Sequence, residues 1–392
     1  MKILLINNYA TRGGAETVFR NTAKLLKEKG NSVITLTQNS SSFDLDSQQY
    51  SIPHNKFFFN RFYSLDSKKI VAEILDKEKP DIVNIHNIIG GLTFSILPEI
   101  KKRRIPLVAT VHDFRMLCPV GIFLNRKGEV CEKCKVGNYF QCIVNNCHPQ
   151  SYYKSLIVAT ESYLRDFFIP HQKYIGTYIF VSNFTRNKFL EYYPEIEKSS
   201  EVLYNFVEDF SNEFFRGDYF LYFGRLDREK GLNLLIDVFK ELPEFNLKIL
   251  GRGEMESEII NINNPNIEYL GFKTGKELKD FIKNSSFVIV PSTCYENLPQ
   301  SILEAFSQSK PVIGSDLGGI KELIQSNVNG FLFKANRKDE LMSTIVNTKN
   351  ISENEYKKLC SNAFKFAKNN FNRNNFYDRL MAIYLNTIEK VK

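Results

Sequence analysis

The sequence predicts an α/β protein built from two doubly wound, parallel-sheet domains. The chain has 392 residues, which is more than one hydrophobic core usually supports. In both halves, short apolar runs typical of buried strands alternate with helical patterns, and this alternation favours parallel sheets covered on both faces. A polar stretch without periodicity, 205–217, separates the halves and reads as the linker. We therefore expect domains at 1–207 and 208–371, and a last helix, 372–392, that crosses back to the first domain.

The first domain is expected to open with a strand over 2–8 and a glycine loop at Gly13 and Gly14. An amphipathic helix follows, and Gly30 is well placed to end it. A cysteine-rich insertion, 118–148, comes before a helix that begins near Tyr152. The further strands of this domain are predicted at 32–37, 82–85, 107–111, 178–181 and 201–204.

The second domain restarts the same alternation, with a helix predicted over 231–242. Its strands are predicted at 219–224, 247–250, 267–270, 287–290 and 312–314. Open α/β sheets bind ligands outside the carboxyl ends of their strands, so we expect the two domains to face each other across a cleft lined by those ends.

Charge and hydropathy exclude several classes of protein. The sequence has no apolar stretch near the roughly 20 residues of a membrane span, and its start reads as a strand and not as a signal peptide, so we expect a cytoplasmic protein. The net charge is +8 and no nucleic-acid-binding module accompanies it, so nucleic acid is not an expected partner. Two segments leave contact with a membrane surface open. The basic cluster 101–104 is either a solvated helix end or a site for anionic lipid, and the aromatic run 56–63 either packs in the core or touches lipid.

Two glutamates eight positions apart, Glu296 and Glu304, bracket the most informative segment. Glu296 follows a buried strand, and Pro299 is predicted as the first residue of the next helix, with Asn297 or Leu298 as its cap. The free N–H groups and positive end of that helix would favour an anionic ligand. A fully helical spacing would place the glutamates roughly 12 Å apart, too far for the paired carboxylates of a glycosidase. We expect them to hold different parts of one elongated ligand.

The loop 224–231 opens the second domain's first helix and carries cations. Gly224 permits a tight turn, and Arg225 and Lys230 leave the same loop, so both cations can converge on a phosphate or diphosphate. The alternative is that the charges serve solubility alone. A third loop, 251–254, also follows a strand, but it is a weak signal by itself.

His112 and Asp113 end a strand of the first domain and are expected to face the same cleft. A histidine there is commonly a hydrogen-bonded rim or core residue, but a neutral imidazole can also hydrogen-bond a sugar hydroxyl or steady a transition state. His86, at another strand end, is a similar but weaker candidate.

Taken together, the run 224–231, the two glutamates, His112, the Gly13–Gly14 loop and the segment 318–322 resemble glycosyltransferase family 4, whose members are retaining enzymes with the two-domain GT-B fold. The resemblance implies a nucleotide-diphosphate sugar as donor, with Arg225 and Lys230 on the diphosphate and Glu304 on the ribose. It further implies that Glu296 and His112 contact the transferred sugar, that Asn297 and Leu298 offer backbone N–H groups, and that Gly13 and Gly14 belong to the donor-binding residues. The acceptor would be a glycan or lipid-linked saccharide of a cell-surface polysaccharide.

This sequence departs from the family pattern at one point and lacks a catalytic metal signature. Many members carry Phe-Gly after the first glutamate, whereas this chain has Asn297, Leu298 and Pro299, which leaves the donor sugar open. No Asp-x-Asp motif marks the cleft, so no catalytic metal is expected. The family mechanism implies front-face attack, in which the leaving phosphate takes the acceptor's proton.

Five of the seven cysteines lie between positions 118 and 147. Cys131 and Cys134 have a zinc-knuckle spacing, and a cytoplasmic chain does not usually keep disulfides. The resemblance to a subset of the same glycosyltransferases favours a structural zinc on Cys118, Cys131, Cys134 and Cys147. The alternative is a set of free buried thiols.

Two other classes of function remain open. A nucleotide-sugar epimerase or a phosphorylase can share the architecture, although the phosphorylase would normally be a much longer chain. A non-catalytic sugar-nucleotide binding protein would usually lose one of the charged anchors, whereas Arg225, Lys230, Glu296 and Glu304 are all present.

Overall fold

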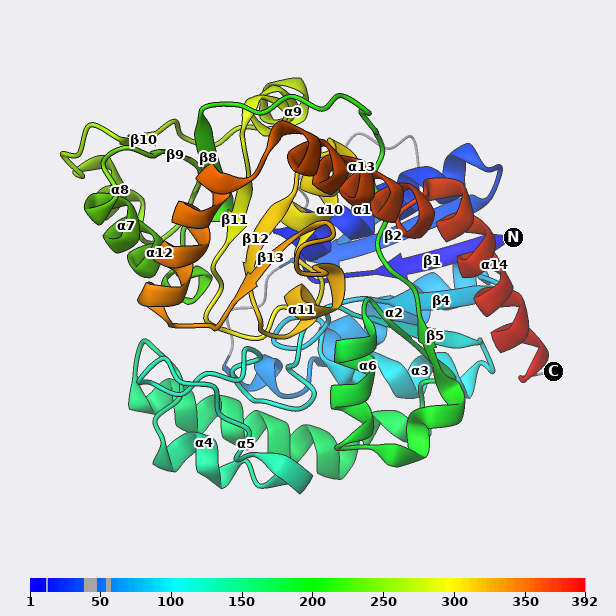
Figure 1. The fold of residues 1–392 in the computed structure, drawn as a ribbon. Coiled ribbons are helices and arrows are strands. Elements are labelled where there is room, and N and C mark those ends of the chain that lie inside the picture. The colour runs from blue at the N-terminus through cyan, green and yellow to red at the C-terminus, as the bar shows by residue number, and fades with distance from the viewer. Residues whose placement is uncertain (12, 39–47, 54–57, 392) are drawn as a thin grey trace. The chain divides into compact units, whose positions relative to one another are not determined.

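The computed structural model describes residues 1–11, 13–38, 48–53 and 58–391, and these residues divide into two compact units (Figure 1). Unit 1 comprises 1–127, 131–205 and 373–392, and unit 2 comprises 128–130 and 206–372. Part of the aromatic run 56–63 falls outside the described residues.

The described residues of unit 1 form a seven-stranded parallel sheet in the order β3-β2-β1-β4-β5-β6-β7. Its strands are β1 (Lys2–Ile6), β2 (Ser32–Gln38), β3 (Gln48–Ile52), β4 (Ile82–Ile85), β5 (Leu107–Val111), β6 (Thr177–Phe180) and β7 (Ser200–Val202). The helices are α1 (Gly14–Glu28), α2 (Leu65–Glu78), α3 (Leu97–Lys102), α4 (Phe140–Val144), α5 (Tyr152–Phe168), α6 (Asn183–Leu190) and α14 (Arg373–Glu389). The last helix packs on this unit, where it contacts α1 and β5.

The described residues of unit 2 form a six-stranded parallel sheet in the order β10-β9-β8-β11-β12-β13. Its strands are β8 (Tyr219–Arg225), β9 (Asn246–Arg252), β10 (Ile267–Tyr269), β11 (Val288–Val290), β12 (Val312–Ser315) and β13 (Gly330–Phe333). The helices are α7 (Leu232–Glu241), α8 (Glu256–Ile260), α9 (Gly275–Asn284), α10 (Gln300–Ser307), α11 (Gly319–Leu323), α12 (Lys338–Asn347) and α13 (Glu353–Asn370).

Burial explains why these apolar runs become parallel strands. Ile3, Leu4, Leu5 and Ile6 of β1 are fully buried, as expected for a strand covered on both faces. In unit 2, Phe220, Phe287 and Tyr356 belong to one core cluster between the sheet and its helices. The predicted fold, two parallel-sheet α/β domains, is confirmed.

Both sheets reverse their strand order next to their first strand. In unit 1 the reversal lies between β1 and β4, and in unit 2 it lies between β8 and β11. Such a reversal is the point where doubly wound sheets bind ligands, outside the carboxyl ends of the strands. The arrangement of the two units relative to each other across a cleft stays a prediction.

In the part of the chain that the structure describes, every helix is too short or too polar to cross a bilayer.

Candidate functional site

In unit 2, Lys230 and Glu296 meet at the switch point of the sheet. The loop after β8 carries Lys230 and the loop after β11 carries Glu296, and Lys230 Nζ lies 2.5 Å from Glu296 Oε1. Ser292 Oγ donates a second hydrogen bond, of 2.7 Å, to the same carboxylate oxygen. The loops after β8 and β11 therefore meet within one unit.

Electrostatics hold this carboxylate in its charged form. Burial raises the pKa of Glu296, but attraction to Lys230, the hydrogen bonds from Lys230 and Ser292, and the charge of Arg225 together lower it below its usual value. Burial likewise lowers the pKa of Lys230, whereas Glu296 raises it, and the net shift is upward. Both groups are thus ionised at neutral pH.

Arg225 stands at the end of β8 and is already engaged by acids. Its guanidinium contacts Asp227, and its Nη2 lies 3.1 Å from Glu229 Oε1. Lys230 and Arg225 are therefore balanced by the acids Asp227, Glu229 and Glu296. About half of the Arg225 side chain is exposed, so it can exchange a carboxylate for another anion.

The turn that presents Lys230 differs in detail from the prediction. Gly224 and Arg225 still belong to β8, and the chain turns later, through the 3₁₀ segment η6 (Arg228–Lys230) and Gly231. Gly231 has φ +76°, and a Cβ there would lie 1.9 Å from Pro291 O. Glycine is required at that position because it combines left-handed backbone with close approach to the β11 loop.

Gly318 and Gly319, for which the sequence predicts no structural role, pack against the backbone of the Glu296 loop. Gly319 N donates a 2.7 Å hydrogen bond to Glu296 O, and a Cβ on Gly319 would lie 2.1 Å from Asn297 O. Gly318 has φ +60° and approaches the Glu296 backbone equally closely. The loop after β12 therefore fixes the backbone of the glutamate loop, and only glycine allows such contact.

The helix after Glu296 begins one residue later than predicted. Pro299 has an extended backbone (ψ 115°) and occupies the N-cap position, so α10 starts at Gln300. The prediction that Pro299 is the first helical residue, capped by Asn297 or Leu298, is wrong. Leu298 is buried and Asn297 partly so, and the backbone of both lies ahead of the helix.

Glu304 lies on α10 and is partly buried. Burial raises its pKa to about 7, and the charge of Lys279 opposes this shift only in part. The two glutamates therefore differ in ionisation. Cations stabilise the charged form of Glu296, whereas Glu304 has no cationic neighbour of comparable effect among the described residues.

In unit 1, His112 follows β5 and forms a pair with His86, which follows β4. His86 Nδ1 lies 2.8 Å from His112 Nε2, and the rings are stacked with their centroids 5.0 Å apart. Burial lowers the pKa of His112 to about 4, and burial and the neighbouring His112 lower the pKa of His86 well below its usual value. Both imidazoles are thus neutral, and they border a small cavity of about 20 Å³ with Asp113 and Arg115.

The remaining glycines of the prediction, Gly13 and Gly14, lie at the start of α1, after β1. Gly14 is the first helical residue and Gly13 its cap. They therefore follow β1, which is the neighbour of β4 at the switch point of unit 1, and His86 follows β4.

The cysteine-rich insertion brings its thiols together. Cys118, Cys134, Cys142 and Cys147 are buried, and burial followed by the charges of Cys118, Cys147 and Cys131 raises the pKa of Cys134 to about 12. Yet in the described part of the chain no group of three or more His, Cys, Asp or Glu side chains is arranged to hold a metal ion. The cluster gathers the predicted ligands without closing a metal site, and zinc stays a prediction.

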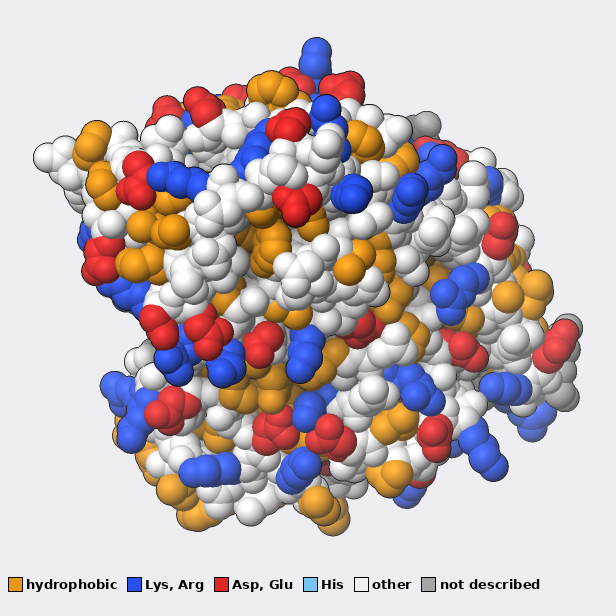
Figure 2. Space-filling model, in the orientation of Figure 1, with side chains coloured by type: hydrophobic (Ala, Val, Ile, Leu, Met, Phe, Trp, Pro, Cys, Tyr) orange, Lys and Arg blue, Asp and Glu red, His pale blue; other side chains and the backbone are white. Residues whose placement is uncertain are grey.

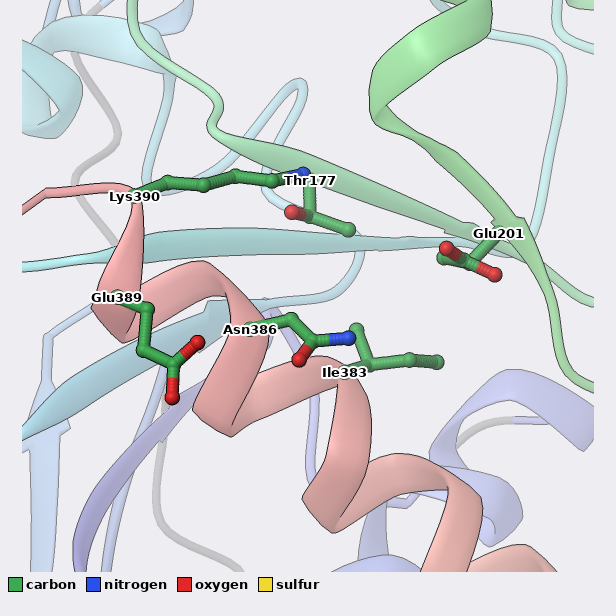
Figure 3. A pocket seen from close by; sticks show the side chains of 6 residues that line it. All are labelled: Thr177, Glu201, Ile383, Asn386, Glu389 and Lys390. Carbon is green, nitrogen blue, oxygen red and sulfur yellow. The ribbon is translucent and has the colours of Figure 1, made fainter.

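A separate hollow of about 340 Å³ lies where α14 crosses β6 and β7 (Figure 3). Its lining residues are Thr177, Glu201, Ile383, Asn386, Glu389 and Lys390. Thr177 is the first residue of β6, so the hollow lies toward the amino end of that strand, whereas the candidate residues follow carboxyl ends. None of the predicted site residues lines it.

Comparison with known proteins identifies the family. Residues 12–209 match the model of Glycosyltransferase Family 4, and residues 208–366 match the model of glycosyl transferases group 1. The chain is 27% identical to an uncharacterized glycosyltransferase of Methanocaldococcus jannaschii, over 94% of this chain and 93% of that protein. It is 25% identical to the putative colanic acid biosynthesis glycosyltransferase WcaL of Salmonella typhimurium, over 42% and 44% of the two chains.

The fold agrees with these matches. The crystal structure of Anabaena HepE in complex with UDP superposes with a TM-score of 0.69 at 19% identity, covering 97% of this chain and 99% of that chain. The architecture is thus that of the GT-B glycosyltransferases, two Rossmann-like parallel-sheet domains. With half of its length matched by one family model and most of the remainder by the other, the chain is a glycosyltransferase and belongs to Glycosyltransferase Family 4.

Proposed function

We propose that the protein is a retaining glycosyltransferase that transfers a sugar from a nucleotide-diphosphate sugar to a glycan acceptor in cell-surface polysaccharide biosynthesis. The observation that carries the proposal is the contact of Lys230 with Glu296, beside Arg225, at the switch point of unit 2. The names of similar proteins support the polysaccharide pathway and the nucleotide-linked donor. WcaL is assigned to colanic acid biosynthesis, and HepE was crystallised with UDP.

In this proposal Arg225 and Lys230 bind the donor diphosphate. Departure of the nucleoside diphosphate builds negative charge, and fixed cations stabilise such charge strongly when they are organised in advance. Lys230 has three N–H donors and Glu296 takes one of them, so donors remain for a phosphate oxygen. Arg225 would release Asp227 or Glu229 to bind the phosphate. These groups would do the work of a divalent metal.

Glu296 would contact the transferred sugar, and Glu304 the ribose. The ionised Glu296 can accept hydrogen bonds from sugar hydroxyls, and the backbone of Asn297 and Leu298 would add N–H donors. In unit 1, which we propose binds the acceptor, the neutral His112 would hydrogen-bond the sugar, and Gly13 and Gly14 would allow close approach of a ligand to the start of α1.

The reaction would proceed by front-face attack. The bond between the anomeric carbon and the leaving phosphate oxygen breaks, and the acceptor oxygen bonds to the same face of that carbon. The acceptor's proton passes to the leaving phosphate, so the configuration at the anomeric carbon is retained. His112, held neutral, would position the sugar and would not itself act as the base.

The experiment compares two arginines of the same loop. Thermal-shift screening with a panel of nucleotide sugars identifies the donor, since a ligand at about 100 times its dissociation constant adds about 2.7 kcal/mol of stability. Donor hydrolysis and transfer are then measured in Arg225→Ala and in Arg228→Ala, whose guanidinium instead contacts the exposed Glu258. We expect at least a roughly 100-fold loss for Arg225→Ala, from about 3 kcal/mol of lost transition-state stabilisation, and little loss for the control.

The same assays separate the alternatives. Near-normal turnover of Arg225→Ala would refute the assignment of that residue. An epimerase would convert the donor sugar without an acceptor, and a binding protein would show a thermal shift but no hydrolysis. The anomeric configuration of the product, read by NMR, decides between retention and inversion. A cytoplasmic location, and a lipid-linked acceptor at the inner face of the membrane, remain part of the proposal.

A further inference from the structure

Three of the four charged residues of helix α5 in unit 1, Glu161, Arg165 and Asp166, meet on its inner side, and the fourth, Lys154, is half-buried near its start. Arg165 is buried, with its Nη1 2.8 Å from Glu161 Oε2 and its Nε 3.0 Å from Asp166 Oδ1. The guanidinium also lies over the ring of Phe94, and Tyr139 donates a hydrogen bond to Asp166. The other buried positions of the helix are Ser155, Ala159 and Ser162. The inward face is thus polar, the reverse of an ordinary surface helix.

The outward face of α5 is apolar throughout. Each exposed residue of this helix is tyrosine, leucine or phenylalanine: Tyr152, Tyr153, Leu156, Tyr163, Leu164 and the Phe167–Phe168 pair. Phe167 is 80% exposed and Tyr153 77%. Isolated exposed apolar residues are common, but a continuous patch along one helix indicates an interaction surface.

The neighbouring α4 extends this patch. Phe140 and Val144 of α4 are exposed, and so is Val136 just before it. Hydrophobic side chains accordingly protrude in Figure 2 along the edge where Figure 1 places α4 and α5. Beneath them, buried Tyr139 and Ala159 pack in one cluster with three cysteines of the insertion, which holds α4 against α5. We call the exposed side as a whole the α4–α5 face.

The exposed charge on this face has one sign. Within 131–168, a range that the structure describes completely, the exposed charged side chains are Lys133 and Lys135. The acids of α5, Glu161 and Asp166, are held inward by Arg165, and Lys135 lies 3.3 Å from Glu191, the exposed residue that follows α6. An apolar, aromatic surface flanked by lysines, with no exposed acid of its own within 131–168, is complementary to an anionic lipid surface.

We propose that the α4–α5 face docks the protein on a membrane surface that contains anionic lipid. Phenylalanine and leucine side chains would enter the boundary of the acyl region, tyrosines would lie at headgroup level, and the lysines would contact lipid phosphates. A second copy of the chain fits less well, because a two-fold contact would bring like-charged lysines together, and the one acid beside them, Glu191, already pairs with Lys135. The proposed function enters this inference only as the reason for docking, which would bring the enzyme to a lipid-linked acceptor.

The experiment measures binding of the whole protein to sedimented vesicles of phosphatidylcholine, with and without phosphatidylglycerol. We expect binding to the mixed vesicles that weakens as salt is added, and much weaker binding to phosphatidylcholine alone. The double variant F167S/F168S should bind the mixed vesicles at least about tenfold more weakly. The control is Phe215→Ser, an aromatic residue of unit 2 that is 56% exposed, close to the 66% of Phe168.

Each outcome decides the matter. Absence of vesicle binding by the wild type, or equal binding by F167S/F168S, overturns the proposal. The proposal is also overturned if the wild type forms a dimer without lipid, as measured by sedimentation, and the double variant is a monomer. Donor hydrolysis without vesicles separates this proposal from the proposed function, because the double variant should hydrolyse donor as the wild type does. Loss of lipid binding with intact hydrolysis supports docking, whereas loss of hydrolysis in both proteins counts against the enzyme assignment alone.

Discussion

Replacing Glu304 by glutamine should stabilise the free protein at alkaline pH. Burial raises the pKa of Glu304 to about 7 from its usual value of 4.5. The folded protein therefore holds a proton that the unfolded chain releases between these two values, and stability falls as pH rises through this window. A pKa raised by about 2.5 corresponds to at most about 3.4 kcal/mol, and to less for a side chain that is only partly buried.

The assay is urea unfolding of wild type and Glu304→Gln from about pH 5 to about pH 8. The stability difference should be small at the acidic end and grow in favour of the variant, levelling above about pH 7. Glu277→Gln, at an exposed position of α9, controls for the loss of one carboxylate. If wild type and Glu304→Gln show the same pH dependence, the carboxyl group does not titrate as its burial implies.

The same variant tests the ribose assignment by donor binding. UDP-glucose is a suitable probe because its diphosphate is esterified at both ends and does not titrate near neutrality. If Glu304 binds ribose hydroxyls as a carboxylate, wild-type affinity should rise with pH through about 7, and Glu304→Gln should flatten this rise. If Glu304→Gln binds UDP-glucose above about pH 7 as tightly as the wild type does, Glu304 does not contact the donor. The prediction for stability would not be affected by that result.

Four further outcomes follow from the structure. Glu296→Gln and Lys230→Met should each lower the free energy of unfolding by about 3 to 5 kcal/mol, because each leaves one buried charge without its partner. The double variant should recover part of that loss, and additive losses in urea unfolding would disprove the coupling. Gly319→Ala should lower the Tm and slow transfer, since its Cβ would clash with Asn297 O, and an unchanged Tm would mean that the loop yields easily. His86→Phe should reduce kcat/KM about tenfold, because it removes the hydrogen-bond partner of His112 Nε2. A change in KM would show that the active enzyme itself is altered, since a loss of folded protein leaves KM unchanged. Chelator-free protein should contain near-stoichiometric zinc by elemental analysis if the cysteine cluster closes on a metal, and zinc-free protein of normal Tm would favour free thiols.

Local patterns were sufficient for the strands that carry the site. Residues 219–223 of β8 and the whole of β11 are apolar and buried, and the polar residues that come after each run lie at the carboxyl edge of the sheet. This is why Glu296 and the Arg225 loop could be placed from the sequence. The edge strands β3 and β13 escaped prediction. β3 is largely exposed and polar, and β13 begins with a glycine, so neither has the buried apolar run that indicates a strand.

Contacts between loops could not be read from the sequence. The Gly318–Gly319 pair was recognised only as part of a family pattern, because its reason is a backbone approach to Glu296 that no periodicity encodes. The one-residue error at Pro299 has a similar origin, since proline is acceptable at both the cap and the first turn. The inverted polarity of α5 was also hidden, because a sequence shows that a helix is two-faced but not which face lies inward, and Arg165 took the buried side.

The meeting of Lys230 and Glu296 is a consequence of strand order. The two residues are 66 positions apart in the sequence, but β8 and β11 are neighbours in the sheet, with Val288 paired to Leu221. Because the strands are parallel, both loops leave from the same edge of the sheet. In the described residues no other strand lies between β8 and β11, so their loops are neighbours. In a sheet that kept sequence order, β9 and β10 would lie between these strands, and the separation of about 4.8 Å per strand would carry Lys230 out of reach of Glu296. The reversal of strand order is therefore what allows a cation and an acid from distant segments to form one site.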